Sequence, residues 1–460
     1  MQSYIDTIRH DPKKLEPVTR LKNFEEIYQF FNNRQVRKQA ERCVQCGDPF
    51  CTVIGCPLQN HIPQWLEAVA NRDLERAFLL SNESSPFPEI LGRICPQSHL
   101  CEGACTLEDG FGAITIGAIE ASITDLAFAA GMELPFPGIR HSHKVAIVGS
   151  GPAGMACAHF LLRAGIGVEM YERVDRPGGL LTYGIPGFKL NKSLVARRFK
   201  LLQKAGLKLH LNHEVGRDGE LNELIAANDA VFIGVGATGG RKAGIPGEDL
   251  PDVVLAMDYL VEKQRQLFGE QAAGISLVTD KRVVVIGGGD TAMDCLRTAI
   301  RDGASEVTCL YRRNEINMPG SAKEYQNAIE EGVEFCFHIS PREIRCEAGV
   351  LCIEVEKTRL GEKASDGRQR IEIIPDTVHC IPADVVILAL GFDVAPLPGL
   401  KTAGIGTDTW AQIKIDPASG RTSNSKVYSG GDCQRGADLV VTAAADGRRA
   451  ALAMMGALLG

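Results

Sequence analysis

The sequence predicts an α/β fold, with two domains built on parallel sheets and an α-helical, cysteine-rich domain before them. Two segments, starting near residues 144 and 282, each read as strand, glycine loop, helix and second strand over about 30 residues. Seven cysteines lie between residues 43 and 105, among helical patterns such as that of residues 62–80. Residues 131–143 are rich in proline and lack periodicity, so we expect a linker there.

The bulk properties of the chain exclude several classes of protein. A formal net charge of −7 and an isoelectric point near 5.9 argue against a nucleic-acid partner, which normally leaves a basic footprint. No apolar run is long enough for a membrane-spanning helix, and residues 1–17 lack the apolar region of a signal peptide. We therefore expect a cytoplasmic protein, in which thiols stay reduced and clustered cysteines bind metal more often than they form disulfides.

The first glycine loop predicts a dinucleotide site. Gly149, Gly151 and Gly154 form G-x-G-x-x-G directly after the strand at residues 145–148. The first glycine permits a tight turn, the second lets a pyrophosphate approach the backbone, and the third lets the helix pack on the strand. The N-terminus of that helix offers N–H groups and a positive dipole end to the phosphates. Glu172 ends the second strand, where a carboxylate can accept hydrogen bonds from ribose hydroxyls.

A second glycine loop follows the strand at residues 282–286, and its candidate nucleotide-binding residues are Gly287, Gly289, Asp290 and Ala292. When the two units are aligned, Arg312 takes the position of Glu172 and Arg313 follows it. A carboxylate there would repel a 2′-phosphate, whereas two guanidinium groups pair with it through charge-assisted hydrogen bonds. The second site is therefore predicted to prefer NADP(H); the alternative is that both arginines are ordinary solvated surface charges.

Two dinucleotide units in one chain suggest FAD in the first and a nicotinamide nucleotide in the second. Other glycine-containing turns supply further candidate cofactor-binding residues, which are Gly179, Leu180, Gly236, Gly391, Gly431 and Asp432. From Lys144 onward the chain resembles the flavoproteins of the glutathione reductase type. In that family a Gly-Asp pair contacts the flavin and the next helix directs its N-terminus at the isoalloxazine, which implies roles for Gly431, Asp432, Val441 and Thr442. The C-x-x-C of the disulfide reductases is missing here, so electrons must leave by another route.

The clustered cysteines form two runs, which are Cys43, Cys46, Cys51 and Cys56, and then Cys95, Cys101 and Cys105. Zinc ribbons pair two C-x₂-C motifs, but only Cys43 and Cys46 have that spacing, and inert structural thiols need no clustering. The first run, followed by proline, resembles with longer gaps the bacterial ferredoxin run, whose last cysteine ligates the other cluster. We therefore expect two [4Fe–4S] clusters. The first three cysteines would hold one, and Cys56 would join the whole second run on the other.

From about residue 24 to the end, the chain resembles the small (beta) subunits of NADPH-dependent glutamate synthase. The same module forms the N-terminal half of dihydropyrimidine dehydrogenase and the large subunit of ferredoxin:NADP transhydrogenases. The motifs that carry the resemblance include "CVQCGDPFCTVIGCP", "GRICPQSHLCEGACT", "ITIGAIE", "GGGDTAMDC" and "GGDCQRGADLVVTAAADGRRAA". In this family a glutamine or glutamate after the second cysteine group completes the first cluster, which implies Glu120 here. The alternative for Glu120 is a carboxylate on a helix surface.

The resemblance also implies the domain plan. Residues 1–140 would form the helical cluster domain with its linker, 141–270 and 391–460 the FAD-binding domain, and 271–390 an inserted NADPH-binding domain.

The implied function is that of an electron-input subunit. NADPH would reduce FAD by hydride transfer, and single electrons would pass through the clusters to a large (alpha) FMN-bearing subunit that makes L-glutamate from glutamine and 2-oxoglutarate. No catalytic side chain is expected, because the hydride moves between bound cofactors. One alternative is a stand-alone or transhydrogenase-type NADPH oxidoreductase that passes electrons to ferredoxin or another acceptor. A redox-inert scaffold is the third, and the complete dinucleotide motifs disfavour it.

Overall fold

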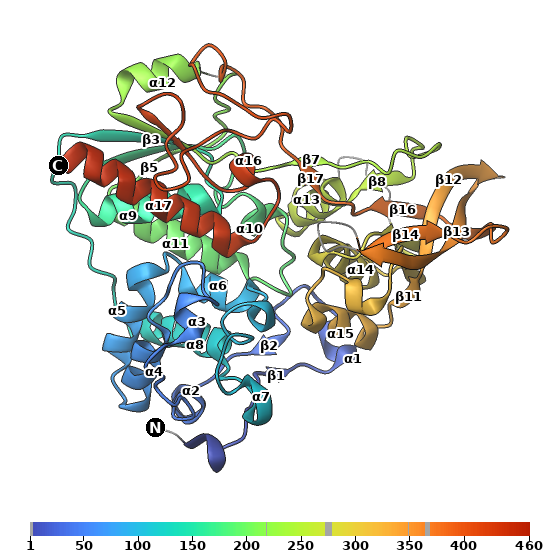
Figure 1. Cartoon of the computed structure of the whole chain (residues 1–460), viewed down its shortest axis with the longest axis horizontal. Coiled ribbons are helices and arrows are strands. Elements are labelled where there is room, and N and C mark those ends of the chain that lie inside the picture. The colour runs from blue at the N-terminus through green and yellow to red at the C-terminus, as the bar shows by residue number, and fades with distance from the viewer. Residues whose placement is uncertain (1–2, 218, 272–277, 348, 364–368) are drawn as a thin grey trace.

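The computed structural model describes residues 3–217, 219–271, 278–347, 349–363 and 369–460, and Figure 1 shows three bodies in it. A helical domain (blue) contacts an α/β domain (green and red), and a second α/β domain (yellow to orange) lies beside them. Within the described ranges, no helix is both long and apolar enough to cross a membrane.

The helical domain packs its helices around a small apolar core. Its helices are α2 (Asn33–Ala40), α3 (Phe50–Val53), α4 (Ile62–Ala70), α5 (Leu74–Ser84), α6 (Pro88–Ile94), η2 (Gln97–His99), α7 (Glu108–Phe111) and α8 (Ile116–Ala129). Asn32 begins α2 with a capping box, which satisfies N–H groups that the first turn leaves free. Trp65, Phe78 and Ile119 are buried in the core between α4, α5 and α8. The cysteine runs lie in the loops and short helices between these longer helices, and residues 131–143 form the predicted linker without helix or strand.

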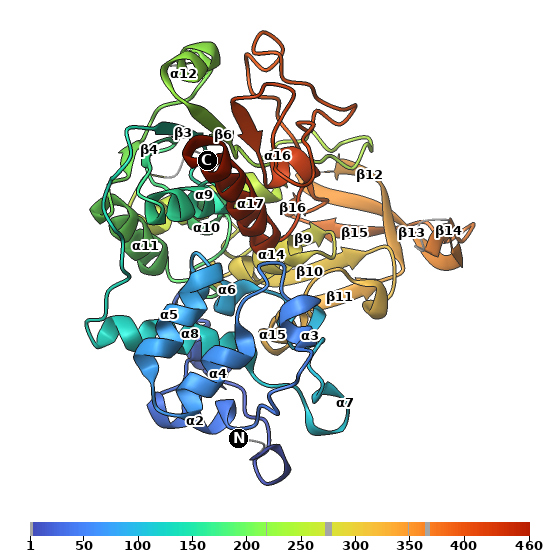
Figure 2. The same ribbon diagram turned by 60° about the vertical axis from the view of Figure 1, so that its left-hand side comes forward.

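The first α/β domain contains five parallel strands in the order β18-β6-β3-β4-β5. The strands are β3 (Lys144–Val148), β4 (Gly167–Tyr171), β5 (Lys208–His210), β6 (Ala230–Ile233) and β18 (Val427–Ser429). The helices are α9 (Pro152–Arg163), α10 (Leu180–Tyr183), α11 (Lys192–Lys204), α12 (Leu221–Ala227), α16 (Asp432–Arg435) and α17 (Val440–Leu459). Val145 and Ile147 belong to one core and Ala146 and Val148 to another, so β3 is covered on both faces. Figure 2 shows α17 running from the C-terminus toward the helical domain.

The second α/β domain has the parallel order β11-β10-β9-β16-β8. Its strands are β8 (Val253–Leu255), β9 (Arg282–Ile286), β10 (Glu306–Tyr311), β11 (Glu334–Phe337) and β16 (Val385–Leu388). Its helices are α13 (Ala256–Leu267), α14 (Asp290–Arg301), η3 (Glu315–Asn317) and α15 (Ala322–Glu330). The antiparallel pair β7 (Gly239–Gly240) and β17 (Phe392–Asp393) joins the two α/β domains.

The structure corrects one predicted boundary of this domain. The second domain was expected to begin at residue 271, but β8 pairs with β16 in the second sheet, and α13 follows β8 directly. The domain therefore begins before Val253. The sequence did not reveal this, because β8 is short and its partner lies more than a hundred residues away.

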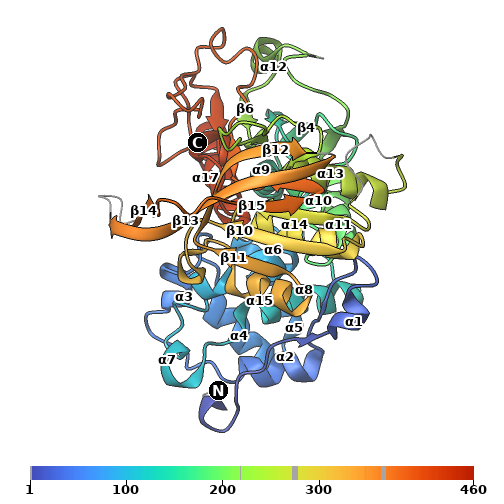
Figure 3. The ribbon, with the colours of Figure 1, turned by 90° about the vertical axis from the view of Figure 1, so that its right-hand side faces the viewer.

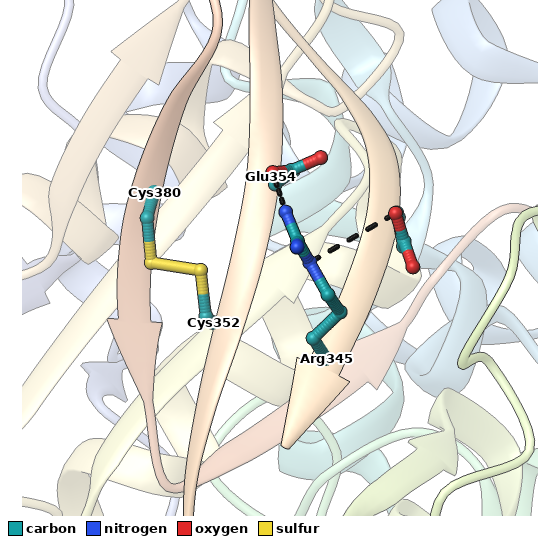
Figure 4. Close-up of a disulfide and its surroundings, with 5 residues drawn as sticks. Arg345, Cys352, Glu354 and Cys380 are labelled. Atoms are coloured by element: carbon teal, nitrogen blue, oxygen red, sulfur yellow. Dashed lines mark ion pairs between the residues drawn. A yellow bond between two sulfur atoms is a disulfide. The ribbon is translucent and has the colours of Figure 1, made fainter. Parts of the chain in front are cut away.

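An antiparallel sheet covers one face of the second parallel sheet, as Figure 3 shows for β12 and β13. Its strands are β12 (Ile339–Glu347), β13 (Val350–Lys363), β14 (Gln369–Ile373) and β15 (His379–Ala383). Cys352 of β13 and Cys380 of β15 form a disulfide, next to the ion pair of Arg345 with Glu354 (Figure 4). The expectation of reduced thiols is wrong for this pair. Neighbouring strands bring the two Cα atoms to 5.5 Å, within the range that a disulfide bridges.

A buried junction of ion pairs connects all three domains. The N-terminal segment, with η1 (Ser3–Ile5), β1 (Lys13–Lys14), α1 (Pro17–Arg20) and β2 (Tyr28–Gln29), runs from the helical domain onto the second α/β domain. There the buried Arg20 pairs with Glu331 at 2.8 Å and with Glu330 at 3.0 Å. Arg297 of α14 also pairs with Glu331, at 2.8 Å. Lys189, from the first α/β domain, pairs with Asp294 of α14 at 2.9 Å.

Candidate functional site

A cavity of about 760 Å³ lies at the carboxyl ends of the strands of the first sheet, a size common for cofactor pockets. In doubly wound sheets this is where ligands bind. The predicted cofactor-binding residues that line it are Gly149, Gly151, Glu172, Gly179, Leu180, Gly236, Gly431 and Asp432. They come from loops far apart in the sequence, which the parallel strands bring to one edge of the sheet.

The first glycine loop has the geometry that its motif requires. Gly149 has φ +96°, and a Cβ there would lie 2.4 Å from the carbonyl oxygen of Gly234. A Cβ on Gly154 would lie 2.0 Å from the carbonyl oxygen of Gly149, so the helix packs closely on the loop. Gly151 precedes α9, and no heavy atom lies within 4 Å of a Cβ built on it. The loop thus leaves open space where a pyrophosphate would approach the backbone.

The two carboxylates at this cavity have different surroundings. Glu172 accepts hydrogen bonds from the backbone N–H groups of Ser150 at 3.0 Å and Val174 at 3.1 Å, which fix its carboxylate at the end of β4. Burial raises the pKa of Asp432 to about 7, against a hydrogen bond from the backbone of Asp438. Asp432 begins α16 directly beside the cavity.

The second α/β domain also contributes to this cavity, which was not expected from the sequence. Met257, Asp258, Val261, Glu262 and Arg265 of α13 line it. No sequence signal could have found them, because the contact depends on how the two α/β domains dock.

The second glycine loop repeats the geometry of the first. Gly287 has φ +142°, and its Cβ would lie 2.2 Å from the carbonyl oxygen of Ala389. Gly289 again has no heavy atom within 4 Å of a Cβ. Ala292 is fully buried behind the loop. The carboxylate of Asp290, on the first residue of α14, accepts a hydrogen bond from the N–H of Ser321 at 3.0 Å.

The two arginines lie where the alignment of the units predicts, directly after β10. Arg312 is exposed. Arg313 donates to the carbonyl oxygen of Gln369 at 3.3 Å, and its buried Nε has no hydrogen-bond partner in the described part of the chain. An unsatisfied buried guanidinium nitrogen fits a site for an anion such as a 2′-phosphate. Gly391 does not line the large cavity. It has φ +97°, and its carbonyl oxygen accepts a hydrogen bond from the N–H of Arg241, next to the β7–β17 pair that joins the two α/β domains.

The cysteines surround two separate cavities in the helical domain. Four thiols line the first, which are Cys43, Cys46, Cys51 and Cys105. Three thiols and one carboxylate line the second, which are Cys56, Cys95, Cys101 and Glu120. All eight candidate ligands are therefore brought together in sets of four, but the predicted division is wrong in two places. Cys105 belongs with the first run, and Glu120 completes the second set instead of the first.

The reason for the different division is the way the two cysteine loops pack. A Cβ on Gly55 would lie 2.7 Å from the Cα of Cys101 and 2.8 Å from the carbonyl oxygen of Leu100, so the loops run against each other at a glycine. Each loop consequently borders both cavities. Cys56 crosses from the first run to the second cavity, and Cys105 crosses from the second run to the first. A crossover like that of the ferredoxins was expected for the first run alone, whereas in the fold the last cysteine of each run lines the other cavity.

The donors around both cavities suit iron–sulfur clusters. Burial, helped by Cys105 and Cys43, raises the pKa of Cys51 to about 12, and burial raises that of Cys56 to about 11. Burial also raises the pKa of Glu120 to about 8, against a hydrogen bond from Asn60. Because their pKa values are raised, these thiols and this carboxyl group lose their protons at neutral pH only next to a positive charge. The iron of a [4Fe–4S] cluster supplies that charge, and its usual ligands are thiolates. Within the described ranges, no three His, Cys, Asp or Glu side chains are arranged to hold a single metal ion.

The first turn of α17 separates the large cavity from the second cysteine cavity. Leu439, Val440 and Ala443 line the large cavity, while Val441 lines the cavity with Glu120. Val441 and Thr442 were expected to face the flavin, but neither lines the large cavity; the hydroxyl of Thr442 donates instead to the carbonyl oxygen of Leu439 at 2.7 Å. Adjacent residues of a helix point in different directions, so one turn borders both cavities.

Comparisons with known proteins divide the chain in the same way. Residues 20–132 match the family described as dihydropyrimidine dehydrogenase domain II, 4Fe-4S cluster. Residues 143–447 match the family described as pyridine nucleotide-disulphide oxidoreductase.

Similar proteins cover almost the whole chain. The glutamate synthase [NADPH] small chain of Halomonas elongata is 46% identical over 454 residues, which are 97% of this chain and 96% of that protein. The Escherichia coli protein AegA, an oxidoreductase by name, is 47% identical over 461 residues, covering 96% of this chain and 69% of AegA. The solved structure of Mycobacterium tuberculosis FprA in complex with NADPH has a TM-score of 0.58 at 23% identity, covers 69% of this chain and 84% of FprA, and shows a common fold. The chain belongs to the family of the glutamate synthase [NADPH] small chain.

Proposed function

We propose that this protein is the electron-input subunit of a glutamate synthase in the cytoplasm. It would oxidise NADPH and deliver electrons to a large (alpha) subunit that makes L-glutamate from glutamine and 2-oxoglutarate. The observation that carries the proposal is the shared wall formed by α17, with the large cavity on one side and a thiol-lined cavity on the other. Family membership supports the choice of reaction.

The large cavity is proposed to bind FAD. The open space at Gly151 would take the pyrophosphate, and the Glu172 carboxylate, held by two backbone N–H groups, would accept from ribose hydroxyls. Gly431 and Asp432 also line this cavity, and a Cβ on Gly431 would lie 3.5 Å from the Cβ of Ala443 in the first turn of α17. Bound FAD supplies the chemistry that no side chain here can, since it accepts a hydride and releases electrons one at a time.

NADPH is proposed to bind at the second glycine loop. Gly289 leaves the space for its pyrophosphate, and Arg312 and Arg313 follow β10 at the position of the 2′-phosphate. These arginines favour NADPH over NADH.

Two [4Fe–4S] clusters are proposed, one for each set of four ligands. The set with Glu120 borders α17 and is therefore nearer the flavin than the set of four cysteines. Electrons would enter the cluster domain at the Glu120 set and leave it from the four-cysteine set.

The acceptor has one alternative, which the similarity to AegA favours. AegA has the same module at 47% identity and is named an oxidoreductase, without reference to glutamate synthesis. In that case ferredoxin or another protein would take the electrons.

An anaerobic titration tests the proposal. The purified chain should contain one FAD and about eight irons, and NADPH should bleach the flavin. Addition of the large subunit with glutamine and 2-oxoglutarate should then produce glutamate at the expense of NADPH, with a much smaller rate when NADH replaces it. Reoxidation by ferredoxin but not by the large subunit would favour the alternative acceptor. Flavin bleaching with no iron in anaerobically prepared protein would refute the electron-transfer role of the cysteines.

A further inference from the structure

Asn60 is a buried polar residue in the lining of the second cysteine cavity, and only 2% of it is exposed. Its side-chain amide donates to Oε1 of Glu120 at 2.7 Å. Its own side-chain oxygen accepts from the hydroxyl of Ser84 at 3.3 Å, so the orientation of the amide is fixed. Asn60 therefore holds one oxygen of the Glu120 carboxylate and leaves the other available to a ligand.

The backbone of Asn60 contacts a second member of the same set. The N–H groups of Leu58, Gln59 and Asn60 form hydrogen bonds to the Cys56 sulfur, and these bonds oppose the rise in its pKa that burial causes. Hydrogen bonds to cluster sulfurs are among the factors that set the reduction potential of a cluster. One residue thus contacts two of the four groups around the second cavity, one through its side chain and one through its main chain.

Asn60 is also connected to the first cavity. The hydroxyl of Thr52 donates to the carbonyl oxygen of Asn60 at 2.9 Å. The backbone N–H of Thr52 in turn donates to the sulfur of its neighbour Cys51. A continuous polar path therefore runs from Cys51 through Thr52 and Asn60 to Glu120.

We propose that Asn60 is the positioning residue of the Glu120 set: its amide orients the Glu120 carboxylate toward the cluster, and its hydrogen bonds link the ligand loops of the two clusters. The inference rests on the proposed function, because it requires a cluster in the second cavity. Hydrogen-bond partners of metal ligands commonly fix the ligand's orientation and tune the metal. The side chain and backbone of Asn60 together contact the Glu120 carboxylate, the Cys56 sulfur and the Thr52 hydroxyl.

The test compares Asn60→Leu, which keeps the branching of the side chain and removes the donor, with Asn60→Asp, which keeps the shape and adds a negative charge. Asn33→Asp is the matched control, since Asn33 is exposed in the first turn of α2 in the same domain. Each protein is prepared anaerobically as the full chain. Iron release to a chelator and the electron paramagnetic resonance spectra during a redox titration are then measured, without any assay of turnover.

In both Asn60 variants, one of the two clusters should retain iron roughly 10–100-fold less tightly, while the other stays as in the wild type. Where the cluster survives, the Glu120 carboxylate no longer shares its negative charge with the Asn60 amide and donates more of it to the iron. This stabilises the oxidised form of the cluster. A tenfold fall in its reduced-to-oxidised ratio at a fixed potential, equivalent to about 59 mV for one electron, is the expected shift. The Asn33→Asp control should leave both clusters unchanged.

Glu120→Gln identifies the affected cluster. If Asn60 acts through Glu120, both single variants alter the same spectrum, and Asn60→Leu adds little once Glu120 has been replaced. Unchanged spectra in the Asn60 variants, or an equal effect on both clusters, would overturn the inference while leaving the proposed function intact. Absence of the second cluster from the wild-type protein would overturn both. Flavin content checks that each variant is folded.

Discussion

The division of the cysteines leads to a prediction that pairs of substitutions can test. Serine has nearly the size of cysteine but lacks the soft thiolate that iron–sulfur clusters select. The structure assigns Cys43 and Cys105 to one set of four and Cys101 to the other. Each set would hold a cluster of four irons, so any one Cys→Ser change should remove about four of about eight irons per chain.

The double variants discriminate between the two possible divisions. The double variant Cys43→Ser with Cys105→Ser changes only one set of ligands. It should therefore lose about four irons per chain, no more than either single variant. Cys101→Ser with Cys105→Ser affects both sets, and should lose about eight. The division predicted from the sequence places Cys101 and Cys105 in one set and Cys43 in the other. It therefore predicts the larger loss of iron for the first double variant and the smaller loss for the second.

Iron analysis of anaerobically purified protein, with flavin content as the internal standard, is the assay. The flavin cavity contains none of these cysteines, so FAD should remain at one per chain and NADPH should still reduce it. If the pair Cys101 and Cys105 removes only half of the iron, the structural division is refuted.

Three further predictions concern the α/β domains and their junction. Gly289→Ala should abolish NADPH binding yet change the free energy of unfolding by less than about 0.5 kcal/mol, because its Cβ would project into open space. Arg312→Glu with Arg313→Ser should raise the KM for NADPH at least tenfold, since each lost charge-assisted hydrogen bond costs about 1.5–3 kcal/mol, and leave that for NADH little changed. Arg20→Met should lower the free energy of unfolding, measured in urea, by about 3 kcal/mol. This is the lower end of the cost of breaking a buried ion pair, because Glu331 keeps Arg297 and Arg301 as partners.

Two of these predictions have a control in the same chain. Gly287→Ala should destabilise the fold by about 1–3 kcal/mol, because Gly287 has φ +142°. Equal stability of the two glycine variants would contradict the geometry of the loop. Arg37→Met breaks a partly exposed pair with Glu41 and should cost less than about 1 kcal/mol. An Arg20 variant as stable as the Arg37 variant would show that the junction contributes nothing, and an unchanged preference for NADPH would reject the 2′-phosphate assignment.

The features that the sequence predicted well depend on local geometry. The roles of Gly149, Gly151 and Gly154 follow from steric limits within one turn, so the motif alone located the loop and the edge of the sheet. The position of Arg312 followed from aligning two units of the same plan.

The features it missed depend on contacts between distant segments. Cys101 and Cys105 are four residues apart, yet they line different cavities, because the loop containing Gly55 packs against Cys101 and Ala104. The place of β8 in the second sheet and the approach of α13 to the large cavity are likewise set by pairing and docking, which no spacing in the sequence encodes.

The buried junction of ion pairs limits which parts of the gene can be exchanged by recombination. Arg20 comes from the first domain along the chain, Lys189 from the second, and their acidic partners from the third. A gene fragment encoding any one domain would lose the pairs that cross between domains and would expose the charges of the junction to water. Recombination would then preserve the three domains only as a block. AegA, a longer protein that this chain matches over 69% of its length, contains such a block complete.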